Sequence, residues 1–68
     1  MKIKINIPRT KEKKIINLEN KATVGDIIKK LNFKPDTIIV MRNNTPIPID
    51  DVVEDNQELT IIQVSSGG

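Results

Sequence analysis

Few residues of this 68-residue chain could carry chemistry. It contains no Cys and no His, which excludes a disulfide framework, a thiolate nucleophile, an imidazole base and an ordinary zinc, copper or haem site. A set of carboxylates follows position 49, but their spacing does not match a calcium-binding EF-hand loop. We interpret them as solvated loop charges: Asp50, Asp51, Glu54, Asp55 and Glu58.

The last group of the chain is the carboxylate of Gly68, preceded by Gly67. A terminal carboxylate with a pKa of about 3.3–3.7 is ionised at neutral pH and has no useful leaving group. Converting it to an acyl-adenylate with ATP supplies that leaving group. A sulfur nucleophile can then form a thiocarboxylate, or a thiol and then a lysine amine can form an isopeptide bond.

This chemistry requires the end of the chain to reach into the active site of a partner. Four extended residues from Ser65 and Ser66 onward span about 13 Å, at roughly 3.3 Å per residue. The final two glycines lack Cβ atoms, so the backbone can pass through a narrow channel. The competing interpretation is a frayed or engineered Ser/Gly tail with no function.

The residues before this tail must form the domain that presents it. Alternating apolar residues predict strands over 1–7 and 14–19, joined by a polar link as an antiparallel hairpin. Between them and the next strand, Val24, Ile27, Ile28 and Leu31 have helical spacing, which predicts a helix over about 23–32. Thr23 is its expected N-cap, Asp26 completes a capping box, and Asn32 is the expected left-handed terminator.

The second half of the chain is expected to complete the sheet. Strands are predicted over 37–42 and 59–64, with a turn at Asn43-Asn44 and a short edge segment over 45–49 that contains two prolines. In the acidic loop that follows, Val52 and Val53 are the expected apolar anchors. We predict a single α+β domain over 1–64, with a mixed four- to five-stranded sheet packed on one helix, and a flexible tail over 65–68.

Four sequence features occur in an order and spacing that resemble a known family. They are the helix start Thr23–Ile28, the strand and turn 40–44 leading to Pro48, the turn 54–58, and the terminal glycine pair. Together they resemble the ubiquitin-like β-grasp sulfur carriers of the ThiS/MoaD group and the related Urm1-like and archaeal small modifier proteins. Asn44 and Asn56 stand where the family often has Gly, a mild change because Asn tolerates a left-handed backbone.

The resemblance implies a β-grasp fold and a carrier that is not an enzyme. Gly68 would be the point of covalent attachment, and Gly67, Ser66 and Ser65 would give it access. An E1-like adenylating enzyme of the MoeB/ThiF/UbaA type would use ATP to activate it, and the carrier would bind no cofactor. A sulfur donor and a sulfur-accepting synthase or tRNA thiolase would complete the reaction, for thiamine, molybdopterin or tRNA thiolation.

Two further functions stay open. The first is conjugation through Gly68 to protein lysines, which shares the activation step. The second is a non-catalytic β-grasp interaction module with an inert tail. The N-terminus lacks the apolar core of a signal peptide and the longest apolar run is four residues, so we expect a cytoplasmic protein without a membrane segment.

Apolar residues on both faces of two predicted strands indicate a partner surface. If Ile38, Val40, Leu59 and Ile61 face the helix, the opposite face is exposed near the tail. We expect this face to dock onto the adenylating enzyme; a cover by the chain itself or a dimer contact is the alternative. Its residues are Ile39, Met41, Ile62 and Val64.

The first predicted hairpin is rich in basic residues. We interpret this as a solvated outer face whose lysines keep exposed strands from pairing with other chains. Direct nucleic-acid binding is not expected, because readers of single strands use stacking aromatic residues and this face has none. The basic residues are Lys2, Lys4, Arg9, Lys11, Lys13 and Lys14.

Overall fold

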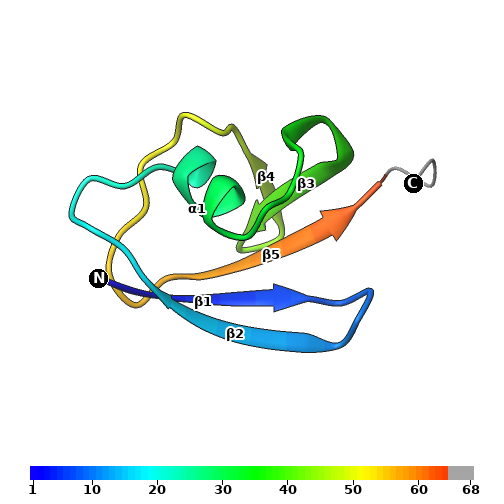
Figure 1. Ribbon diagram of the computed structural model, residues 1–68, viewed down its shortest axis with the longest axis horizontal. Coiled ribbons are helices and arrows are strands. Elements are labelled where there is room, and N and C mark those ends of the chain that lie inside the picture. The colour runs from blue at the N-terminus through cyan, green and yellow to red at the C-terminus, as the bar shows by residue number, and fades with distance from the viewer. Residues whose placement is uncertain (65–68) are drawn as a thin grey trace.

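The structure of the protein is a computed structural model that describes residues 1–64. In that range one helix packs on a five-stranded mixed sheet, which is the predicted β-grasp architecture (Figure 1). The strand order is β2-β1-β5-β3-β4, and the central pair of β1 and β5 is parallel while the other neighbours are antiparallel. The elements are β1 (Lys2–Ile7), β2 (Glu12–Asn17), α1 (Val24–Lys30), the 3₁₀-helix η1 (Pro35–Thr37), β3 (Ile38–Arg42), β4 (Thr45–Ile47) and β5 (Glu58–Gln63).

The first hairpin follows the alternation of its sequence. In β1 the isoleucines 3, 5 and 7 are buried against the core while Lys2 and Lys4 are exposed. The prediction placed the second strand at 14–19, but β2 begins at Glu12 and ends at Asn17. Lys11, with a φ of 59°, ends the turn directly before this strand. The two additional strand residues are charged and lie on an exposed edge, so the alternation of apolar residues did not reveal them.

Helix α1 begins as predicted. The Thr23 hydroxyl accepts from the Asp26 N–H at 3.3 Å, and the Asp26 carboxylate accepts from the Thr23 N–H at 2.9 Å. The next two unpaired N–H groups, of Val24 and Gly25, donate to the carbonyls of Asp51 and Ile49 at 2.9 and 2.7 Å. A Cβ at position 25 would lie 3.3 Å from that Ile49 oxygen, so glycine allows this close approach.

The helix ends earlier than predicted and the chain then turns back to the sheet. Asn32 adopts the expected left-handed conformation with a φ of 62°, two residues beyond the last helical residue. A tight turn at Asn43 and Asn44, both with positive φ, joins β3 to the edge strand β4. In the following loop Val53 is buried as predicted, but Val52 is about half exposed and pairs only through its backbone with Thr23.

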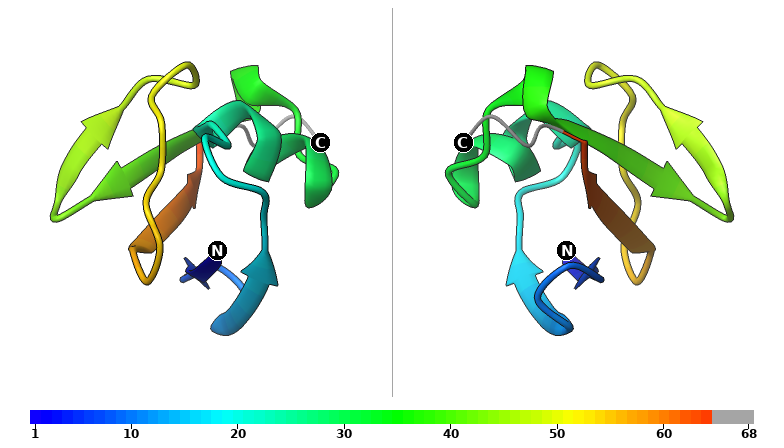
Figure 2. Two further views of the ribbon diagram at one scale, coloured as in Figure 1. Left: turned by 90° about the vertical axis from the view of Figure 1, so that its left-hand side faces the viewer. Right: turned by 90° about the vertical axis from the view of Figure 1, so that its right-hand side faces the viewer.

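The core lies between α1 and the inner face of the sheet, which curls around the helix in Figure 2. It contains no buried polar or charged residue in the described range. No helix in residues 1–64 is long and apolar enough to cross a membrane. The buried residues are Ile3, Ile5, Ile7, Ile16, Ala22, Val24, Ile27, Ile28, Ile38, Val40, Val53, Leu59 and Ile61.

Candidate functional site

The residues predicted to react lie outside the described range, and their attachment point lies inside it. Ser65, Ser66, Gly67 and Gly68 are beyond residue 64, so their roles stay predictions. The chain reaches them from β5, a central strand held by β1 on one side and β3 on the other. One step past the end of β5, the Val64 N–H donates to the Thr37 carbonyl at 2.9 Å. The root of the C-terminal segment is therefore fixed to the end of η1, directly before β3.

The outer face of the sheet carries exposed apolar side chains beside this root. Ile39 and Ile62 are cross-strand partners and remain 41% and 37% exposed, and Val64 is 53% exposed. We call Ile39, Met41, Ile62 and Val64 the apolar patch. Their inward neighbours on the same strands are buried, as predicted: Ile38, Val40, Leu59 and Ile61. The patch is thus the solvent side of a two-faced sheet.

Met41 occupies the remote edge of the apolar patch. It lies opposite Thr60 on β5 and opposite Pro46 on β4, and it is only partly exposed. Because β3 runs antiparallel to β5, Met41 is two residues farther from the chain exit than Ile39. Ile39, Ile62 and Val64 therefore form the part of the patch nearest the root.

The basic residues of the first hairpin are exposed as expected, but Lys14 pairs with Ile5 and therefore lies on the helix side of the sheet, not on its outer face. Strand β2 is an edge strand, and its Lys13 and Lys14 are exposed. The Lys14 ammonium forms an ion pair with Glu12 at 3.6 Å. Phe33, the single aromatic residue, packs against the core and so offers no stacking surface on this face. Charged side chains on an exposed edge disfavour pairing with another chain.

The acidic residues of the loop take part in local contacts. Asp51 binds the Arg42 guanidinium at 2.8 Å, and Asp55 accepts from the Lys2 N–H at 2.7 Å. Glu58 accepts a hydrogen bond from the Asn6 side chain. Within residues 1–64 no group of three or more potential metal ligands comes together. These contacts fasten the loop to the sheet, and they give Asp51, Asp55 and Glu58 a structural role that the interpretation of solvated loop charges did not include.

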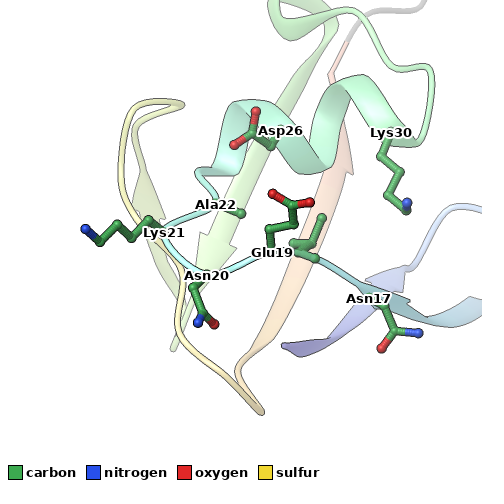
Figure 3. A pocket seen from close by; sticks show the side chains of 8 residues that line it. Asn17, Glu19, Asn20, Lys21, Ala22, Asp26 and Lys30 are labelled. Atoms are coloured by element: carbon green, nitrogen blue, oxygen red, sulfur yellow. The ribbon is translucent and has the colours of Figure 1, made fainter.

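A polar hollow of about 340 Å³ lies between the end of β2 and helix α1. Figure 3 shows Glu19 directing its carboxylate toward the helix, while Lys21 points away from it. Asp26, also in its wall, is already engaged with the Thr23 N–H in the capping box. The hollow contains both acidic and basic side chains, and one of its carboxylates is already hydrogen-bonded at the start of the helix. It therefore provides no free set of metal ligands. Its lining residues are Asn17, Leu18, Glu19, Asn20, Lys21, Ala22, Asp26 and Lys30.

Sequence reasoning missed one residue at the root of the C-terminal segment. Gln63 occupies the inward position that follows Leu59 and Ile61, and its amide oxygen is buried without a hydrogen-bond donor among residues 1–64. The available signal was the alternation itself, because positions 59, 61 and 63 share one face of the strand. A polar residue at the third of these positions indicates a local departure from an apolar core.

Comparisons with known proteins agree with this architecture. A profile of the family described as Small archaeal modifier protein 2 matches residues 1–65. An uncharacterized protein of Archaeoglobus fulgidus is 34% identical, and the sulfur carrier protein TtuB of Thermus thermophilus is 21% identical, each over the full length of both chains.

Solved structures of ubiquitin-like proteins share the fold. Ubiquitin of Caldiarchaeum subterraneum aligns with a TM-score of 0.81 at 23% identity, covering 100% of this chain and 98% of that one. SAMP1 of Haloferax volcanii aligns with a TM-score of 0.76 at 19% identity over all of both chains. These likenesses establish the β-grasp fold.

Proposed function

Because the chain belongs to the Small archaeal modifier protein 2 family, we propose that it is a ubiquitin-like carrier whose Gly68 carboxylate is activated by an E1-like enzyme and converted to a thiocarboxylate for sulfur transfer. Small archaeal modifier proteins are carriers or modifiers rather than enzymes, in agreement with the expectation from the sequence. The chemistry is then performed by the partner, and this chain contributes the reacting carboxylate and the surface that delivers it.

The proposed activation occurs in two displacements. A carboxylate oxygen of Gly68 attacks the α-phosphorus of ATP, forming the acyl-adenylate and releasing pyrophosphate. A sulfur nucleophile at the oxidation level of hydrosulfide then attacks the carbonyl carbon and expels AMP, leaving a thiocarboxylate. The second step forms a carbon–sulfur bond and breaks the mixed anhydride, so it needs no oxidant or reductant. Because ATP is consumed, we place the reaction in the cytoplasm.

The observation that carries the proposal is the apolar patch beside a firmly held exit. Exposed apolar side chains that cluster on one face mark contact surfaces. Here the cluster of Ile39, Ile62 and Val64 lies where the chain leaves a central strand. A partner that binds the patch would receive the following residues at a defined position. The direction of β5 therefore suits delivery of a terminal carboxylate to a bound enzyme.

The two outcomes of activation draw support from different relatives. The name of TtuB, a sulfur carrier protein, supports the thiocarboxylate. The family description, modifier protein, supports conjugation to lysine side chains of other proteins. In that second function the same adenylate passes to a thiol and then to a lysine amine, which forms an isopeptide bond. Both functions require a free carboxylate at Gly68.

The test is ATP-dependent conversion of the intact protein. The protein is incubated with ATP, an E1-like enzyme from an organism that encodes this chain, and sulfide, and the product is measured by mass spectrometry. We expect a mass gain equal to the replacement of one oxygen by sulfur at residue 68. Omission of ATP, deletion of Gly67-Gly68, or an alanine added permanently after Gly68 should each prevent the gain.

Conjugation is tested in cells that produce the wild-type protein, the form without Gly67-Gly68, or the form with an alanine added after Gly68. Covalent adducts on protein lysines that require Gly68 would assign the modifier function as well. Unchanged mass of the wild-type protein with active enzyme, together with unaltered partner binding after deletion of Gly67-Gly68, would contradict the proposal and favour an interaction module with an inert tail.

A further inference from the structure

A small hollow opens on the helix side of the sheet, at the end where β5 leaves it. Its volume is about 210 Å³. Because β1 and β5 are parallel, the β1–β2 turn lies at this same end of the sheet, beside the chain exit (Figure 1). The segment that follows α1 forms the opposite wall of the hollow. The lining residues are Ile7, Thr10, Glu12, Lys14, Leu31, Phe33 and Gln63.

Gln63, in the wall of this hollow, has a polar side-chain atom without a partner among residues 1–64. The Gln63 side-chain oxygen is buried, and no donor among residues 1–64 reaches it. An unsatisfied buried acceptor normally destabilises a fold, and most such atoms in native proteins have a partner. Gln63 stands at an inward position of a strand whose other inward residues, Leu59 and Ile61, are completely buried. An apolar residue there would extend the core, so the amide oxygen needs another explanation.

We propose that this hollow is a socket for an arginine side chain of the protein that binds the C-terminal segment. The inference rests on the proposed function, because it takes that protein to be the activating enzyme. A guanidinium carries five N–H donors and no acceptor, which suits an oxygen without a donor. It also suits the nearby carboxylate of Glu12, the second acceptor in the wall.

The other walls fit the remainder of an arginine. Ile7 and Leu31 are apolar and offer packing for its methylene stem. The ring of Phe33 gives the planar guanidinium an aromatic neighbour. Lys14 is the one opposing feature, since its ammonium is paired with Glu12 at 3.6 Å. Both of those side chains are about half exposed, so Lys14 can be displaced into solvent.

The position of the socket gives it a role in docking. Gln63 precedes Val64 and lies on the opposite face of β5 from Ile62, a member of the apolar patch. An enzyme that covers the patch and also inserts an arginine into the socket would hold β5 from both faces. The residues after 64 would then leave in one direction only.

The socket is tested first without any enzyme. N-acetyl-arginine methylamide is titrated into ¹⁵N- and ¹³C-labelled protein, and the Gln63 side-chain amide and the Leu31 methyl signals are followed. We expect saturable shifts with a Kd of about 1–100 mM, the range for so small a ligand. N-acetyl-citrulline methylamide, which has the same shape without the charge, should bind at least about fivefold more weakly.

Three variants assign the contacts. Gln63→Leu should weaken arginine binding at least about tenfold, and Glu12→Gln should weaken it as well. Lys14→Gln should strengthen it, because the competing cation is removed. Equal affinity of wild type and Gln63→Leu, or absence of saturable shifts in the wild type, would mean that water alone serves this oxygen, and would overturn the inference.

Measurements of thermal stability distinguish a binding role of Gln63 from a purely structural one. The melting temperature of Gln63→Leu should be no lower than that of the wild type, since the variant removes an unsatisfied acceptor from an apolar site. A clear fall in both Gln63→Leu and the unbranched variant Gln63→Met would show that the amide is bonded in the free protein, which contradicts the inference.

Enzyme kinetics then distinguish the two proposals. With the activating enzyme, Gln63→Leu should raise the KM for this protein about tenfold while kcat stays near the wild-type value. Activation with the same KM for both forms would refute the socket and leave the proposed function intact. Failure of the wild type to be activated would refute the proposed function, and the titration would still report on the socket.

Discussion

Replacing Ile62 with Ser tests whether the apolar patch is the docking surface. Ile62 lies at the centre of the patch, opposite Ile39, and its side chain points away from the core. The matched control is Ile15→Ser on the same outer face, where Ile15 pairs with Lys4 and is 65% exposed. Lys4 also pairs with Glu58, so Ile15 lies two strands away from Ile62 and four residues back along β5, a separation of roughly 16 Å.

The expected magnitude follows from the exposure of Ile62. Full burial of an isoleucine contributes about 1.5–3 kcal/mol, and 37% of this residue is still exposed in the free protein. Docking therefore gains roughly 0.6–1 kcal/mol from this side chain. A serine hydroxyl buried without a partner costs at least about 1 kcal/mol more. The two effects together weaken binding by about 2 kcal/mol, or roughly 30-fold in KM.

The assay measures the rate of ATP-dependent activation as a function of carrier concentration. Ile62→Ser should raise KM roughly 30-fold with little change in kcat, while Ile15→Ser should stay within about twofold of the wild type. Thermal melts of both variants check that the sheet is intact. Equal effects of the two substitutions, or a wild-type KM for Ile62→Ser, would refute the assignment of the patch. Since Ile15 is the more exposed residue, a general loss of surface apolarity would affect it more.

Three more predictions concern the fold that holds the patch. Thr23→Ala should lower the free energy of unfolding by only about 1 kcal/mol, because the Asp26 N–H loses the Thr23 hydroxyl but keeps the Thr23 carbonyl at 3.0 Å, and the Val24 and Gly25 N–H groups keep their acceptors; Thr23→Ser should restore it, as measured by urea unfolding. Ile61→Ala should cost about 2–5 kcal/mol, since the side chain is fully buried, and should leave much of the protein unfolded by circular dichroism. Hydrogen bonding with Thr10 and the charge of Lys14 lower the pKa of Glu12 below its ordinary 4.5. Ionised Glu12 therefore stabilises the fold above about pH 4.5, and this contribution is lost as the pH falls through the lowered pKa; Glu12→Gln should flatten the acid end of the melting-temperature profile.

Much of the fold was predictable because its signals are local and repeated. The alternation of Ile3, Ile5 and Ile7 specifies a two-faced strand, and the structure buries all three. Thr23 and Asp26 form the predicted capping box, since both partners lie within one helical turn. The exposed side of β3 and β5 was predicted in the same way, because one face of each strand must cover the helix.

The remaining features depend on contacts between distant segments. Charged residues at the start of β2 form a strand only because β1 pairs with them, so the strand begins two residues before the predicted position. Val52 was expected to be an anchor, but its backbone pairing with Thr23 turns its side chain outward. The buried oxygen of Gln63 depends on side chains from β1, β2 and the segment after α1, and no sequence window contains them all.

Because β1 pairs in parallel with β5, the complete sheet can form only after β5 has been synthesised. Among the strands of residues 1–64, β1 is translated before the others, and its parallel neighbour β5 is translated after them. A nascent chain that stops before β5 lacks Leu59 and Ile61, two fully buried core side chains, and cannot close the sheet. Truncated copies would then never display a finished surface to an activating enzyme. Only a chain translated through β5 would present the apolar patch to that enzyme.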